Sequence, residues 1–283
     1  MGYLISHPKL ELEIKLEEIK KLKSHEQFIP CVVEPLSDEI KQGIIKHPVI
    51  VDRETLLILD GIHRVAALQN LGYKLIPVCL VDYNNPSIKV GSWFRIVKSD
   101  KKSNENIRKD LEELGYDLEE ILNNELRKEM CAKKIIIGIV TLRKCYGIRG
   151  KIGSIKEVYD YIKHLEISLR SVGYDIGYET EGDAVYKVKS NEALAAIIAP
   201  RIAKRDVVAA TLSREVFAHK STRHVIPARP LFVNVPIEWL GMDLKEANKL
   251  LLEYLCKKKI THLPVGQMLD RRYEEELYVF GGV

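Results

Sequence analysis

The chain has 283 residues, of which 46% are hydrophobic and 30% are charged, a balance that is typical of folded globular proteins and excludes disordered and fibrous ones. Its 44 basic and 40 acidic residues leave a formal net charge of only +4, so nucleic acid is not expected as a partner. No stretch approaches the roughly 18 uncharged apolar residues that span a bilayer, and the first ten residues, MGYLISHPKL, lack a signal-peptide pattern. We therefore expect a cytoplasmic protein that has no membrane partner.

The first third of the chain predicts a compact unit of strands and helices. Residues 11–23 carry apolar side chains in a mixed pattern that fits a strand near its start and a helix near its end, and both assignments stay open. After them, the patterns predict a short helix from Ser37 toward Lys46, a β-hairpin made of residues 47–51 and 56–60, a helix from Ile62 that stops at Gly72, and a strand over 74–83.

The remainder of the chain begins with a polar, charge-dense stretch over 98–133 that predicts a helical connection. Alternating strands and helices then indicate a second unit of the α/β or α+β class. The expected elements are strands over 134–140, 174–180, 183–188 and 194–202, helices over 154–171 and 203–220, and a tail over 242–280 with a helix, a turn at Pro264, a second helix and a final strand.

The sequence Asp60, Gly61, Ile62, His63, Arg64 lies where the second hairpin strand leads directly into a helix. The N–H groups of a first helical turn and the positive end of the helix dipole make such a turn a site for anions. Glycine lets a phosphate approach the backbone, histidine and arginine add donors, and the aspartate could hold a Mg²⁺ ion that bridges phosphates. The alternative is that Asp60 only caps the helix.

A second candidate is the loop His25, Glu26, Gln27. A loop glutamate is in most cases a solvated surface residue. If folding brings Glu26 beside the Asp60 turn, its carboxylate could act as a general base toward a substrate hydroxyl.

The third candidate is the run Ser221, Thr222, Arg223, His224. Arginine binds carboxylates and phosphates through two parallel hydrogen bonds, and hydroxyl groups complete such sites. The alternative is a simple helix C-terminus with basic side chains that complement the dipole. Trp93 is either a core residue or the wall of a pocket.

Residues 22–83, with LKSHEQ, HPVIVD, LLILDGIHRVAALQNLG and KLIPVCLVDY, resemble the ParB/sulfiredoxin-like domain of archaeal free serine kinases. The segment STRHVIP at 221–227 resembles a TRH-containing segment found late in those kinases, whereas residues 100–200 match only vaguely. The resemblance implies an α+β fold with a ParB/sulfiredoxin-like catalytic domain over 1–99. A second α/β lobe over 100–283 would form a cleft with it, contribute substrate-binding residues and carry a C-terminal helical extension.

The same resemblance implies the phosphorylation of free L-serine to O-phospho-L-serine, a product that would feed cysteine or serine metabolism. Its donor would be ATP or ADP with Mg²⁺, and pyrophosphate stays open as a third donor. The implied residues are Glu26 as catalytic base, Asp60 and His63 in catalysis, Gly61, Ile62, His63 and Arg64 at the nucleotide, Asp60 at the metal, and Trp93, Thr222, Arg223 and His224 at serine.

Rival functions remain within this resemblance. Sulfiredoxins carry their reactive cysteine in the equivalent turn, where this chain has Ile62, so that chemistry is excluded. The five scattered cysteines predict neither a disulfide framework nor a zinc site. A ParB-like nucleotide-binding regulator or a DNA-binding protein without catalytic transfer stays as the alternative, although the chain shows no clear recognition helix. The oligomeric state is not predicted.

Overall fold

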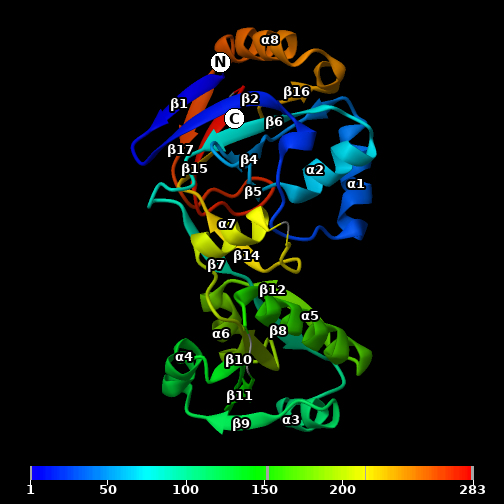
Figure 1. Cartoon of the computed structure of the whole chain (residues 1–283), viewed down its shortest axis with the longest axis vertical. Coiled ribbons are helices and arrows are strands. Elements are labelled where there is room, and N and C mark those ends of the chain that lie inside the picture. Colours follow the sequence, from blue (N-terminus) through cyan, green and yellow to red (C-terminus); the bar gives the residue numbers. More distant parts are fainter. Residues whose placement is uncertain (1, 151–152, 214, 282–283) are drawn as a thin grey trace. The chain divides into compact units, whose positions relative to one another are not determined.

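The computed structural model describes residues 2–150, 153–213 and 215–281, and the chain forms two compact units (Figure 1). The first unit contains residues 1–89, 211–215 and 224–283, and the second contains residues 90–210 and 216–223. The expected division after residue 99 differs from this grouping, in which residues 224–283 belong to the same unit as residues 1–89. The expected cleft between two lobes stays a prediction.

A five-stranded sheet forms the core of the first unit. Its order is β1 (Tyr3–His7), β2 (Leu10–Glu18), β6 (Leu75–Val81), β4 (Val49–Asp52) and β5 (Ile58–Asp60). β4 and β6 are parallel and the other neighbours are antiparallel. All residues of β6 are buried, as is usual for a strand between two neighbours with both faces covered. The predicted β4–β5 hairpin and the strand predicted over 74–83 are confirmed. Residues 11–23, for which both a strand and a helix were left open, form mainly a strand.

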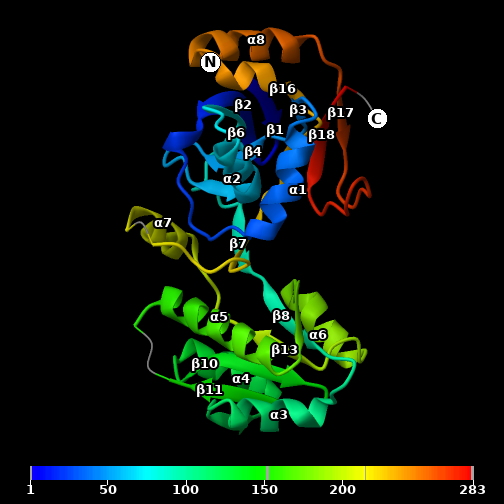
Figure 2. The ribbon, with the colours of Figure 1, turned by 90° about the vertical axis from the view of Figure 1, so that its right-hand side faces the viewer.

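Helices α1 (Pro30–Ile40) and α2 (Ile62–Asn70) lie side by side in the first unit (Figure 2). The helix expected to begin at Ser37 is wrong in its position, because α1 begins at Pro30 and contains Pro35. Proline is tolerated in a first helical turn, and α1 continues through the inner Pro35 while it packs against α2 with Val33 and Ile40 buried.

The C-terminal residues complete the first unit. α8 (Leu244–Cys256) covers β2, where the Asn248 side chain bonds the backbone N–H and carbonyl of Leu16. The second helix expected in the tail is wrong, because the residues between the turn at Pro264 and the final strand form bends and an isolated bridge between Met268 and Arg272. β17 (Ile260–Leu263) and β18 (Glu276–Phe280) join β15 (Ala228–Leu231) in a three-stranded sheet, β16 (Val235–Pro236) pairs with β3 (Ile44–Ile45), and short 3₁₀ turns lie at Ile19–Lys21 and Ile237–Gly241.

The second unit is built on a six-stranded antiparallel sheet. Its order is β12 (Asp175–Glu179), β8 (Phe94–Lys98), β13 (Ala195–Ile198), β10 (Ile135–Thr141), β11 (Cys145–Arg149) and β9 (Leu118–Ile121). Its helices are α3 (Asn104–Glu113), α4 (Asn123–Cys131), α5 (Ile155–Ser171) and α6 (Glu181–Lys189). The α+β class is thus confirmed.

Two sequence-based assignments in the second half of the chain need correction. Residues 183–188 belong to α6 and not to a strand, because the Thr180 hydroxyl accepts the N–H of Asp183 and caps the helix. The helix expected over 203–220 ends earlier, as α7 (Lys204–Leu212). β7 (Lys89–Ser92) and β14 (Thr222–Val225) pair with each other, and the division between the units falls within both strands.

Within the described part of the chain, none of the helices has both the length and the apolar character needed to span a bilayer.

Candidate active site

The turn between β5 and α2 is set by Gly61, whose φ of 100° lies in the left-handed region. Glycine adopts this region without the penalty that a side chain brings. A Cβ atom at this position would lie 3.0 Å from a Val49 methyl group and 3.2 Å from the Arg64 guanidinium. The N–H groups of a first helical turn have no acceptor within their own helix, so the feature on which the predicted anion site depends is present, and the site itself stays a prediction.

Asp60 is surrounded by arginines. Arg229 Nη1 donates to Asp60 Oδ2 at 2.8 Å, and Arg64 Nη2 lies 3.8 Å from the same oxygen. Burial alone would raise the pKa of Asp60, but the positive charges of Arg229 and Arg64 outweigh burial and hold the pKa well below its usual value. Asp60 is therefore ionised at neutral pH.

Arg229 is a site residue that the sequence-based reasoning missed. Its Nε pairs with Glu275, which also lies 3.4 Å from Arg271. Glu275, in the C-terminal segment, thus holds Arg229 in place, and Arg229 in turn holds Asp60. An arginine within the apolar stretch ARPLFV is the one sign of this role in the sequence, because a buried guanidinium needs acidic partners.

The loop that carries Glu26 is anchored at both ends to the flanks of the Asp60 turn. At its start, Lys23 pairs in parallel with Leu57, three residues before Asp60. At its end, the Ile29 N–H donates to His63 Nε2 at 3.0 Å. Between these anchors, the Glu26 side chain is 13% exposed.

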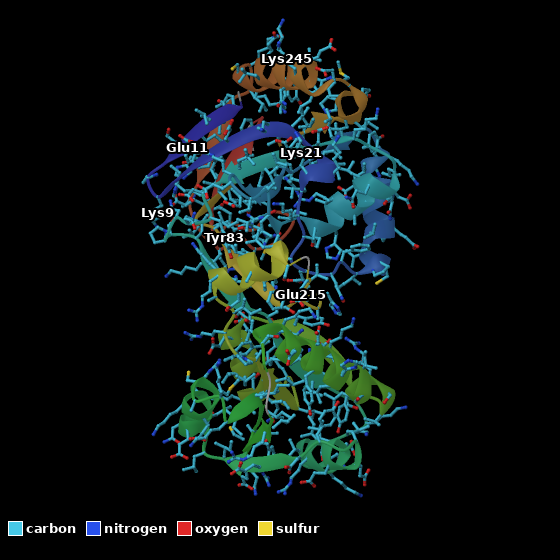
Figure 3. The ribbon with its side chains drawn as sticks, in the orientation of Figure 1. Lys9, Glu11, Lys21, Tyr83, Glu215 and Lys245 are labelled. Atoms are coloured by element: carbon cyan, nitrogen blue, oxygen red, sulfur yellow. The ribbon has the colours of Figure 1, made fainter. Side chains whose placement is uncertain are left out.

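His25 ties this loop to the third candidate segment. The rings of His25 and His224 meet edge to face with centroids 5.2 Å apart. His224 Nε2 lies 2.9 Å from the hydroxyl of Tyr83, which follows β6 (Figure 3). Burial lowers the pKa of His25 to about 4, so its ring is neutral at neutral pH, and the 3.9 Å approach of its Nε2 to Glu26 is not an ion pair there.

The other serine-site candidates lie in the second unit. Trp93 is half-buried, with the Arg223 guanidinium 5.6 Å and the Lys220 Nζ 4.9 Å from its ring centroid, which is the range of cation–π contacts. Thr222 is buried. Arg223 and Lys220 are therefore both neighbours of the Trp93 ring.

A fully buried arginine supports these residues. Arg95 pairs with Glu166 in the interior of the second unit, and its Nη1 donates to the backbone carbonyls of Trp93 and Lys220. The Tyr178 hydroxyl donates to the other oxygen of Glu166. Arg95 thus fixes the backbone at Trp93 and at Lys220, three residues before Arg223.

Arg64 and Ile62 are two further residues that the resemblance implies at the nucleotide. Arg64 Nη1 donates to the carbonyls of His47 and Pro48, so this nitrogen of the guanidinium stabilises the fold. Ile62 is the first residue of α2 and is half-buried.

The described residues contain no group of three or more His, Cys, Asp or Glu side chains that could hold a metal ion. Mg²⁺ is commonly held by one or two carboxylates together with substrate phosphates. Asp60 is 43% exposed, and its arginine contacts both use Oδ2. Its carboxylate therefore fits the role of a single protein ligand to a nucleotide-bound Mg²⁺.

The similarity of the chain to known proteins is not limited to these motifs. No family model matches the chain. An ATP-dependent L-serine kinase of Staphylothermus marinus is 28% identical over 259 residues, covering 84% of this chain and 97% of the relative. An ADP-dependent L-serine kinase of Thermococcus kodakarensis is 26% identical over 238 residues, covering 82% of this chain and 95% of the relative.

The solved structures agree with the sequence relatives. A free serine kinase, with one glutamate replaced by alanine and in complex with AMP, superimposes with a TM-score of 0.66 at 27% identity, covering 84% of this chain and 97% of that one. These matches confirm the resemblance that the motifs indicated. Over most of its length, in sequence and in fold, the chain is similar to the archaeal L-serine kinases.

Proposed function

We propose that this protein transfers the terminal phosphoryl group of ATP or ADP to the hydroxyl of free L-serine. The relatives similar over most of the chain are named as L-serine kinases that use one or the other of these nucleotides. The observation that carries the proposal is the anchoring of the Glu26 loop. Its start pairs beside β5, its end bonds to His63, and His25 contacts His224.

In this proposal Glu26 accepts the proton of the serine hydroxyl as its oxygen forms a bond to the terminal phosphorus. The bond from that phosphorus to the bridging oxygen breaks, and its electron pair leaves with ADP, or with AMP when ADP is the donor. A general base of this kind contributes about 10²- to 10⁴-fold to the rate.

The Asp60 turn would hold the phosphates of the donor. The helix N–H groups after Gly61, together with His63 and Arg64, would offset the charge that grows on the transferred group and on the leaving group, and most phosphoryl-transfer catalysis comes from such stabilisation. Mg²⁺, held by Asp60, would neutralise phosphate charge when bound.

Serine would be bound by Trp93, Thr222, Arg223 and His224. Arginine offers the serine carboxylate two parallel hydrogen bonds, and the cation–π pairing with Trp93 keeps the guanidinium in place. We further propose that the reaction takes place in the cytoplasm and that the phosphoserine is used in amino-acid biosynthesis, as a precursor of cysteine.

The test is to incubate the purified protein with L-serine and Mg²⁺ and, in turn, ATP, ADP or pyrophosphate, and to measure phosphoserine by mass spectrometry. Glu26→Gln should lower kcat by about 10²- to 10⁴-fold while the Kd for AMP stays unchanged. Glu34→Gln is the matched control, because Glu34 is an exposed carboxylate on the neighbouring helix α1. Near-normal turnover of Glu26→Gln would remove Glu26 as the base. Nucleotide binding by the unmodified protein without phosphoserine would favour the regulator instead.

A further inference from the structure

The His224 side chain is enclosed by two rings of the first unit. The His25 ring meets it edge to face with centroids 5.2 Å apart, and the Tyr83 ring lies 5.3 Å away at an interplanar angle of 62°. His25 is 5% and Tyr83 is 2% exposed, so the surroundings fix both rings. The Tyr83 hydroxyl lies 2.9 Å from His224 Nε2. Packing and this hydrogen bond together hold the imidazole in one orientation.

Tyr83 is itself fixed by a buried carboxylate. Its backbone N–H donates to Asp52 Oδ1 at 3.0 Å, and Asp52 Oδ2 accepts the N–H and the hydroxyl of Thr55 at 2.9 and 2.6 Å. Asp52 is the last residue of β4 and is 3% exposed. Hydrogen bonds to a carboxylate are stronger than bonds between neutral groups. These three bonds therefore hold the chain after β6, and the phenol ring of Tyr83, in a defined place.

The Tyr83 hydroxyl is the donor in its bond to His224. Burial, reinforced by the negative charge of Asp52, raises the pKa of Tyr83 well above its usual value, so the hydroxyl keeps its proton at neutral pH. A phenolic oxygen shares a lone pair with its ring, whereas an unprotonated imidazole nitrogen has its lone pair in the ring plane and is the better acceptor. Because the hydroxyl then donates to Nε2, the proton of the neutral imidazole is on Nδ1.

We propose that Tyr83 is a positioning residue for serine, because it holds His224 in the tautomer whose proton is on Nδ1. With Nε2 bonded by Tyr83, the imidazole meets an oxygen atom of serine as a donor, through Nδ1–H, and does not take the hydroxyl proton. The role of base is thereby left to Glu26. This assignment rests on the proposed function, since it takes His224 as a serine-binding residue, and it goes further by giving a role to Tyr83 and a defined tautomer to His224.

The first test measures the tautomer without any substrate. Long-range ¹H–¹⁵N correlation spectra of the ¹⁵N-labelled protein at about pH 8, above the usual histidine pKa of about 6.5, separate protonated from unprotonated ring nitrogens. His224→Gln identifies which of the eight histidines gives each signal. We expect His224 Nδ1 to be protonated and Nε2 to be unprotonated. Tyr83→Phe, which removes the hydroxyl and keeps the ring, should populate the form that carries the proton on Nε2.

The second test measures L-serine binding by titration calorimetry at saturating AMP. Tyr83→Phe should weaken serine binding about 2- to 10-fold, which corresponds to the loss of one hydrogen bond, and should leave the Kd for AMP unchanged. Tyr116→Phe is the matched control, because it removes a hydroxyl that bonds Ser168 at 3.2 Å in the second unit, where neither residue has a proposed role. This control should bind both ligands as the unmodified protein does.

Signals that place the proton of neutral His224 on Nε2 in the unmodified protein overturn the tautomer. Serine affinity that is the same in Tyr83→Phe and Tyr116→Phe overturns the positioning role. Neither result touches the proposed reaction, which is judged by the phosphoserine that the unmodified protein forms. Conversely, an Nδ1–H signal of His224 that is lost in Tyr83→Phe supports the assigned tautomer even where no phosphoserine is found.

Discussion

Replacing Glu166 with glutamine would remove the negative charge that accompanies Arg95 in the interior of the second unit. Arg95 is 0% and Glu166 4% exposed, and the Glu166 carboxylate bonds both Arg95 and the Tyr178 hydroxyl. The substituted amide would keep an acceptor oxygen but leave the guanidinium charge without a counter-charge, far from water.

Loss of one partner from a buried ion pair costs about 3–5 kcal/mol. With a denaturant dependence of ~2 kcal/mol per molar urea, the unfolding midpoint of the second unit should fall by about 2 M. Trp93 reports on this unit and Trp239 on the first. The experiment therefore uses a Trp239→Phe background and follows Trp93 fluorescence against urea.

The matched control is Glu119→Gln, which removes the partner of Arg149 on the surface of the same unit, where both side chains are nearly half exposed. Surface pairs contribute little, so this midpoint should not move measurably. Equal midpoints for Glu166→Gln and Glu119→Gln would refute the reasoning that burial makes the Arg95 pair essential.

Three further predictions concern the candidate site. Gly61→Ala should cost about 1–2 kcal/mol for the left-handed backbone and also weaken AMP binding, because the new Cβ enters the turn; Gly72→Ala, at φ 78° with open space around it, should lower stability without changing the Kd for AMP. Arg223→Ala should raise the KM for serine more than the KM for nucleotide, and equal increases in steady-state assays would contradict its placement at serine. The pKa of His25 is about 4 in the folded protein and about 6.5 when unfolded, so its contribution to stability is full above pH 6.5 and is lost as the pH falls toward 4. Urea unfolding between pH 7.5 and pH 5 should show a loss of stability that is about 2 kcal/mol smaller in His25→Asn than in the unmodified protein, because His47, whose pKa is also about 4, contributes equally in both.

Local patterns predicted the parts of the structure whose causes are local. The hairpin that ends at Asp60 and the helix after Gly61 follow from alternation, helical period and a glycine between them. The strand expected over 183–188 was wrong because two local signals compete there: a threonine cap and terminal charges favour a helix in spite of the apolar alternation.

Long-range contacts account for what the sequence did not show. Helix α1 forms through two prolines because packing against α2 stabilises it, and no local rule reports that packing. The anchoring of the Glu26 loop depends on hydrogen bonds to Leu56 and His63, and Arg229 meets Asp60 across 169 residues of sequence. A single sequence, without an alignment of related sequences, does not show which distant residues form such contacts.

The discontinuous first unit has a consequence for how the protein is made. At about 5–20 residues per second, the ribosome adds the 169 residues between Asp60 and Arg229 in roughly 10–30 s, and Glu275 emerges later still. During that interval the Asp60 turn of the nascent chain lacks Arg229 and the strand β15 that carries Arg229. Nucleotide should therefore be unable to stabilise the growing chain until the segment that carries Glu275 has left the ribosome.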